Sequence, residues 1–168
     1  MRKQAGLVVW TVWPPFVRGR LRASGIPEDL RPGLLVVAPT PPPVHGVSVF
    51  TTMLLSSMEL RTRFRVRHVD LADRRSSHNM GRLDVRNVVL AFVHVAEVLV
   101  AAWTQRPALC YLSLSQNALA FQRDALLIAA ARGSGARVVT HLHGGYFGEF
   151  YRTAAGPLRW MIRHTLGW

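Results

Sequence analysis

Four short apolar runs, at residues 34–38, 64–71, 108–114 and 137–142, constrain the fold of this chain most strongly. Each run has the length of a β-strand, and longer segments with helical character separate them. The predicted helices cover residues 47–60, 83–104, 117–132 and 157–166. Connections of this length let successive strands run parallel. The alternation therefore predicts an α/β fold with a doubly wound, Rossmann-like and mainly parallel sheet.

Residues 1–32 differ from the rest of the chain. They show no hydrophobic period and hold several proline, glycine and basic residues, so we expect an irregular basic N-terminal extension. Pro14-Pro15 follows its short apolar run and no small-residue cleavage site is apparent, which argues against a signal peptide. Residues 33–168 suffice for one Rossmann-like domain. Because 166–168 end on a helical segment, a truncated larger enzyme fits at least as well as a complete domain.

The charge balance bears on the partners of the protein. Twenty-one Lys and Arg against nine acidic residues give a net charge of +12. A positive field of this size attracts phosphates, nucleic acid or anionic lipid headgroups, unless it only keeps the surface solvated. No signature of DNA or RNA binding accompanies the charge, so we expect no nucleic-acid partner.

Four arginines lie close together in the sequence: Arg61, Arg63, Arg65 and Arg67. Their period of two predicts that all four point to one face of the second strand. That face is either a solvated sheet edge or a patch for lipid headgroups or a polyphosphate acceptor. On the second alternative, the protein makes peripheral contact with an anionic membrane on its cytoplasmic side.

The apolar segment 88–103 is too short for a transmembrane helix, which needs about 20 mostly apolar residues, and it contains His94 and Glu97. We expect a buried helix in which these two side chains bond to each other. Cys110 is the only cysteine, so a disulfide within the chain is excluded and a buried thiol is expected. This favours a reducing, cytoplasmic compartment.

Two predicted strand ends carry residues suited to ligand binding. After the first strand, Gly46 lets a ligand approach the backbone, His45 can bond a hydroxyl or phosphate, and the following helix offers free amides. The alternative is a stiff proline turn. After the fourth strand, His141 and His143 are two residues apart, yet without a third ligand they predict no metal site.

We expect His143 to reach the crevice, where it binds a hydroxyl or transfers a proton. Gly144 and Gly145 have no side chains that would fill this crevice. Glu149 follows on the same predicted loop, either orienting an acceptor or serving as an ordinary surface acid.

The chain over residues 34–166 resembles the N-terminal half of GT-B-fold glycosyltransferases, in particular the retaining family 4 enzymes that build bacterial polysaccharides. The similarity lies in residues 41–48, 111–117 and 138–145. It implies transfer of a hexose from a nucleotide-diphosphate sugar to a polysaccharide or lipid-linked acceptor, with no bound cofactor or metal. It assigns the catalytic role to His143. The predicted substrate-binding residues are His45, Gly46, Asn117, Gly144, Gly145 and Glu149.

In these enzymes a C-terminal domain holds the donor with two glutamates seven residues apart. None of the glutamates here, Glu28, Glu59, Glu97 and Glu149, has that spacing. The resemblance therefore implies a missing donor domain, and we expect residues 1–168 alone to be inactive.

Two other functions remain open. The run His143-Gly144-Gly145-Tyr146 is similar to the His-Gly-Gly-Gly oxyanion loop of lipase-like α/β hydrolases, although Tyr146 replaces the third glycine and no G-x-S-x-G elbow occurs. A non-catalytic module that binds anions would also suit the basic charge. On the glycosyltransferase hypothesis, His45, Asn117 and His143 gather along one groove that receives the acceptor.

Overall fold

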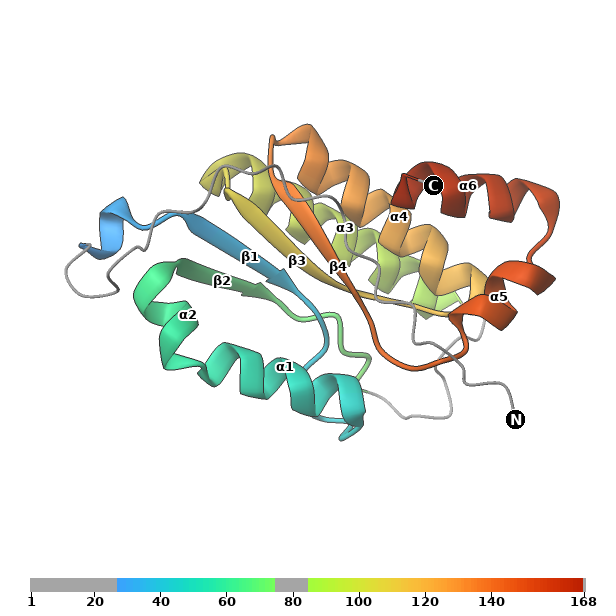
Figure 1. The fold of residues 1–168 in the computed structure, drawn as a ribbon, viewed down its shortest axis with the longest axis horizontal. Coiled ribbons are helices and arrows are strands. Elements are labelled where there is room, and N and C mark those ends of the chain that lie inside the picture. The colour runs from blue at the N-terminus through green and yellow to red at the C-terminus, as the bar shows by residue number, and fades with distance from the viewer. Residues whose placement is uncertain (1–26, 75–84, 168) are drawn as a thin grey trace, which may run out of the picture.

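A parallel β-sheet forms the centre of the molecule, as a computed structural model of residues 27–74 and 85–167 shows (Figure 1). Its strands are β1 (Gly33–Val37), β2 (Arg65–Val69), β3 (Leu109–Leu114) and β4 (Arg137–Leu142), in the order β2-β1-β3-β4. All three neighbouring pairs are parallel. The predicted α/β class with a Rossmann-like parallel sheet is thereby confirmed.

Strand β1 lies in the middle and is covered on both faces, which explains its unbroken apolar sequence. Leu35 and Val37 belong to the larger core cluster, together with helix residues from the second half of the chain. Leu34, Val36 and Ala38 point to the other face, against side chains of the first two helices. The two core clusters therefore lie on opposite faces of the sheet.

The helices divide between these faces (Figure 1). α1 (Gly46–Ser56) and α2 (Met58–Arg63) cover one face over β1 and β2. α3 (Val85–Gln105), α4 (Ala118–Gly133) and α6 (Gly156–Leu166) cover the other. Phe121, Leu127 and Ile128 of α4 are completely buried or nearly so, which makes α4 the main helix of the core.

The first predicted helix, 47–60, is in fact two helices. Ser57 leaves the helical conformation, and its Oγ accepts a hydrogen bond from the amide of Leu60 at the start of α2. A serine that bonds to the backbone three residues ahead is a typical helix cap. Between β4 and α6 a further short helix, α5 (Phe147–Thr153), occupies the stretch expected to be a loop.

The prediction that four arginines share a strand face is wrong for two of them. Arg61 and Arg63 lie in α2, and only Arg65 and Arg67 lie in β2. Arg63 forms an ion pair with Glu59, 2.8 Å between Nη2 and Oε1. All four side chains are nevertheless exposed, so the region remains basic at the surface.

The prediction that the apolar segment 88–103 forms a buried helix is also wrong, because only one side of this helix, α3, is buried. His94, Val98, Ala101 and Ala102 of α3 are buried, whereas the opposite half of the helix exposes large apolar side chains. These exposed residues are Val85, Val88, Val89, Phe92, Val93, Leu99, Val100 and Trp103. Residues 88–105 are long and apolar enough to span a membrane, with a mean hydropathy of 1.7, and 22% of them are buried.

The expected hydrogen bond between His94 and Glu97 is absent as well. His94 is 3% exposed, while Glu97 lies on the exposed side of the helix. Two parts of the sequence predictions, the extension up to residue 26 and the first two residues of the predicted helix 83–104, lie outside the described residues.

Candidate functional site

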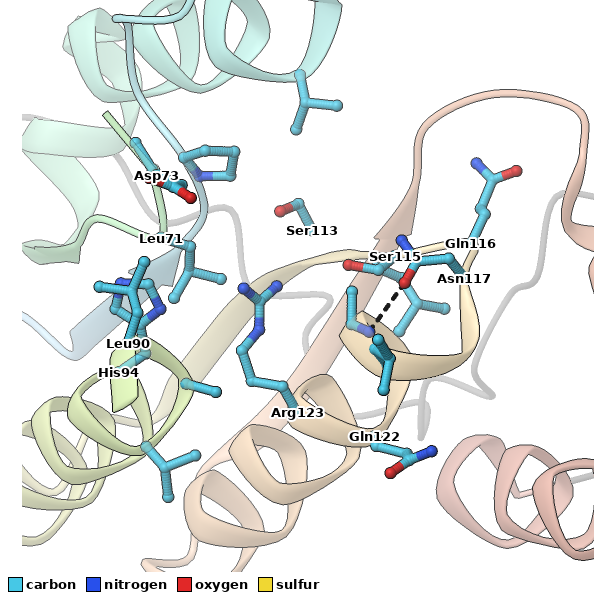
Figure 2. A pocket seen from close by; sticks show the side chains of 18 of the residues that line it. Leu71, Asp73, Leu90, His94, Ser113, Ser115, Gln116, Asn117, Gln122 and Arg123 are labelled. Atoms are coloured by element: carbon cyan, nitrogen blue, oxygen red, sulfur yellow. Dashed lines mark hydrogen bonds between the residues drawn. The ribbon is translucent and has the colours of Figure 1, made fainter. Parts of the chain in front are cut away.

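A pocket of about 500 Å³ opens at the carboxyl ends of the strands, between the start of α1, α3 and the start of α4 (Figure 2). The strand order reverses here, since the chain passes from β1 to β2 on one side and then to β3 on the other. Such a switch point is where open α/β sheets bind their ligands. His45, Asn117 and His143 all line this pocket, so the structure places them in one groove.

His45 caps α1. Its Nδ1 accepts a hydrogen bond from the amide of Ser48 at 3.3 Å, and the Ser48 hydroxyl accepts one from the His45 amide at 3.0 Å. Because Nδ1 is an acceptor, the neutral imidazole carries its proton on Nε2. His45 therefore offers an N–H donor to a ligand.

Asn117 caps α4 in the same way, because its side-chain oxygen accepts from the amide of Ala120 at 2.9 Å, a bond drawn in Figure 2. The oxygen is thus engaged within the protein. A contact between Asn117 and a ligand would come from the amide nitrogen, again as a donor.

His143 belongs to an aromatic cluster beside the pocket. Its ring lies 3.9 Å from that of His141, and Phe50 of α1 packs edge-on against both. The Tyr111 hydroxyl is 2.7 Å from His141 Nδ1 and 3.4 Å from His143 Nε2. Burial lowers the pKa of His143, and the neighbouring His141 and His45 lower it further. The lowered pKa favours the neutral form of His143, which can accept a proton.

The two glycines after His143 do not line the pocket. Gly144 has a φ of +103°, where a side chain would be strained, and a Cβ there would lie 3.2 Å from Nε2 of Gln116. Gln116 in turn donates from Nε2 to the carbonyl oxygen of His143. Gly144 is thus needed for the turn that brings His143 against Gln116.

Gly46 and Glu149 also lie outside the pocket wall. A Cβ on Gly46 would meet no atom within 4 Å, so the start of α1 is open. Glu149 lies in α5, forms an exposed ion pair with Arg152 and has the contacts of a surface residue. Of the predicted catalytic and substrate-binding residues, the structure gathers His45, Asn117 and His143 alone around the pocket.

The other wall comes from α3 and α4, and the sequence analysis assigned it no site. His94 and Arg123 line it, and Figure 2 shows Arg123 between the two helices. Asp124, completely buried, accepts from both Arg123 Nε and Nη2 and from the amide of Ser115. A charged pair inside the apolar segment 117–132 was the one sequence signal for this wall.

His94 is neutral across the physiological range. Burial lowers the pKa of His94 to about 4, and the positive charge of Arg123 acts in the same direction, against the opposite effect of Asp70 and Asp73. Among residues 27–74 and 85–167, its Nδ1 finds no hydrogen-bond partner. A buried imidazole without a partner is costly, so this atom needs an explanation.

Asp70 connects the loops that follow β1 and β2 by hydrogen bonds. Its carboxylate accepts from the Thr40 amide and hydroxyl, from the Ala72 amide and from Arg74. Burial alone would raise the pKa of Asp70, but these four hydrogen bonds outweigh it and lower the pKa. The exits of β1 and β2 are thereby held together.

No group of three or more His, Cys, Asp or Glu side chains within residues 27–74 and 85–167 could hold a metal ion. Cys110 is fully buried, and burial raises the pKa of its thiol to about 12. The thiol is therefore protonated and unreactive.

No known protein family, curated protein or solved structure matches this chain. What the fold and the site define is a class of molecule: a doubly wound α/β protein with a pocket at its topological switch point. Any activity has to be argued from the pocket itself.

Proposed function

We propose that this chain is the acceptor-binding domain of a retaining GT-B-fold glycosyltransferase. One observation carries the proposal. The three segments of the sequence resemblance reach the exits of β1, β3 and β4, and His45, Asn117 and His143, which come from different segments, line the same pocket. Residues so far apart in the sequence converge only because the strands are parallel.

The chemistry of these groups suits an acceptor rich in hydroxyls. His45 and Asn117 offer N–H donors, while the neutral His143 can accept the proton of an attacking hydroxyl. In this scheme the hexose comes from a nucleotide-diphosphate sugar bound by a further domain, and no cofactor takes part. The open start of α1 at Gly46 would face the departing diphosphate, where helix amides stabilise negative charge.

The hydrolase alternative has less support. Within the described residues, the His143 ring lies beside His141 and Phe50, and the hydroxyl within 3.4 Å of its Nε2 is that of Tyr111. A serine nucleophile would need to lie within hydrogen-bond reach of its base. An anion-binding module remains the competing proposal, since the chain carries +12 and its exposed arginines could contact anionic lipid on the cytoplasmic side of a membrane.

The test is a titration of the ¹⁵N-labelled chain with mono- and oligosaccharides, followed by NMR. We expect shifts at His45, Asn117 and His143, and weaker binding by His143→Ala. His164→Ala is the matched control, because His164 stacks on Trp160 in α6, away from the pocket. Binding of simple phosphates in place of sugars would favour the anion module.

A transfer assay tests the second part of the proposal. We expect no sugar transfer by residues 1–168 with any nucleotide-diphosphate sugar, because the donor site belongs to a further domain. Transfer catalysed by this chain alone would contradict that assignment.

A further inference from the structure

Two buried side-chain atoms have no hydrogen-bond partner in the described part of the chain, His94 Nδ1 and Gln116 Oε1. Both residues line the same pocket. They lie on opposite sides of it in Figure 2, His94 on α3 and Gln116 after β3. Each unpaired atom costs free energy, and a ligand that bonds to it offsets that cost.

The two atoms limit what that ligand can be. Gln116 Oε1 only accepts hydrogen bonds, because it is the oxygen of the amide whose Nε2 donates to the carbonyl oxygen of His143. An anionic oxygen cannot donate to it, whereas a hydroxyl can. His94 is uncharged, and the charge of Arg123 is already matched by Asp124. The interior of the pocket therefore favours an uncharged, hydroxylated group.

The mouth of the pocket has the opposite character. Val88 and Phe92 of α3 and Leu119 and Leu126 of α4 line it, yet they are 42%, 70%, 38% and 56% exposed. On α3 this apolar surface continues into exposed side chains outside the pocket. Apolar patches of this kind mark sites where another apolar group binds.

We propose that the pocket binds an amphiphile with an uncharged polyhydroxylated head and a hydrocarbon chain, such as a glycolipid. The head lies between His94 and Gln116, and the chain lies between α3 and α4 at the mouth. This inference rests on the proposed function, because the head is then the sugar acceptor. His94 Nδ1 and Gln116 Oε1 are closed to solvent, so both side chains turn slightly when the head binds, which their soft terminal torsions allow.

The first experiment compares three probes with the full chain by calorimetry and NMR: glucose, octyl glucoside below its micelle concentration, and octyl sulfate. Burial of a few methylene groups should make octyl glucoside bind about tenfold more tightly than glucose. Octyl sulfate should bind more weakly than octyl glucoside. Equal affinity for glucose and octyl glucoside, or a preference for octyl sulfate, would overturn the proposal.

A pair of double variants tests the mouth. Val88→Ser with Phe92→Ser removes the two apolar residues of α3 that line the pocket. Val89→Ser with Val93→Ser changes their neighbours, which are exposed to a similar degree but do not line it. We expect the first pair to lose most of the tenfold advantage of octyl glucoside. The second pair should keep it, and equal losses by both pairs would overturn the proposed site.

The position of the head is tested first in the wild-type chain and then with one variant. The ¹⁵N signal of His94 Nδ1 in the wild-type chain should move on addition of octyl glucoside and stay unchanged with octyl sulfate. The variant His94→Phe should weaken the binding of octyl glucoside and narrow its difference from octyl sulfate. An unmoved His94 signal with bound octyl glucoside would place the head elsewhere and refute the proposal.

These results separate the two proposals. Octyl glucoside binding as expected, with no transfer to it by any enzyme that contains this domain, would refute the glycosyltransferase and leave the amphiphile site. If free sugars bind at His143 and the hydrocarbon chain of octyl glucoside adds no affinity, the amphiphile site is refuted and the glycosyltransferase proposal stands.

Discussion

The two walls of the pocket differ in how their polar groups are satisfied. In the wall formed by strand ends, His45 and Asn117 each use one side-chain atom to cap a helix and keep a donor for a ligand. In the wall formed by α3 and α4, both carboxylate oxygens of Asp124 accept hydrogen bonds, while His94 has a buried atom that no other described residue pairs with. The strand-end wall also holds one buried atom without a partner among the described residues, Gln116 Oε1, so each wall carries a cost that a ligand can remove.

The largest effect is expected from Asp124→Ala, which breaks the helical wall. The change leaves the Ser115 amide and part of Arg123 without an acceptor, so the free energy of unfolding should fall by about 4 kcal/mol. Urea denaturation measures this loss. Asp124→Asn, which keeps one oxygen acceptor, should lose less, and equal losses would show that the hydrogen bonds contribute little.

The buried His94 should make stability depend on pH. Its pKa in the folded protein is about 4, below the ordinary value of 6.5, so the unfolded chain binds the proton more tightly. Stability is therefore complete above pH 6.5 and is lost as the pH falls toward 4, by about 3 kcal/mol for this group. Denaturation curves of wild type and His94→Phe at pH 7 and pH 4.5 measure the difference. Parallel losses in both proteins would exclude His94 as the cause.

The caps of the strand-end wall predict a separation of stability from binding. Asn117→Ala should cost about 1 kcal/mol, because α4 loses its N-cap. Asn117→Ser keeps a capping oxygen and should restore most of that stability, yet it lacks the amide donor. Saccharide titrations of both variants should show the same weakened affinity. Full affinity of Asn117→Ser would mean that the cap alone matters.

The smallest effect on stability is expected at the surface arginines. Arg63→Ala removes an exposed ion pair with Glu59 and should change the free energy of unfolding by less than about 0.5 kcal/mol. The double variant Arg65→Glu with Arg67→Glu should, however, reduce flotation with vesicles of anionic lipid and leave neutral vesicles unaffected. Flotation that does not depend on anionic lipid would remove the membrane contact.

The fold could be predicted because each apolar run was short and each connection long. The strand 137–142 agrees with β4 at both ends, and 108–114 differs from β3 by one residue. The strand-end wall followed from the same pattern, since residues after parallel strands gather at one edge of the sheet.

The helical wall could not be predicted, because it depends on how α3 packs beside α4. Helical periodicity places His94 and Val98 on one face, but the sequence does not show that the opposite apolar face stays exposed. The break at Ser57 was missed for a similar reason. Serine is acceptable within a helix, and only the bond from the Leu60 amide shows that it starts a new one.

The bond from Gln116 Nε2 to the carbonyl oxygen of His143 joins the exits of β3 and β4. Gln116 carries one of the unpaired atoms, and His143 is the base of the proposed reaction. A ligand that moves the amide of Gln116 therefore also moves the backbone of His143. Binding of the polar head at Gln116 would in this way change the position of the His143 side chain. On the proposed function, such coupling would delay proton transfer until the acceptor is bound.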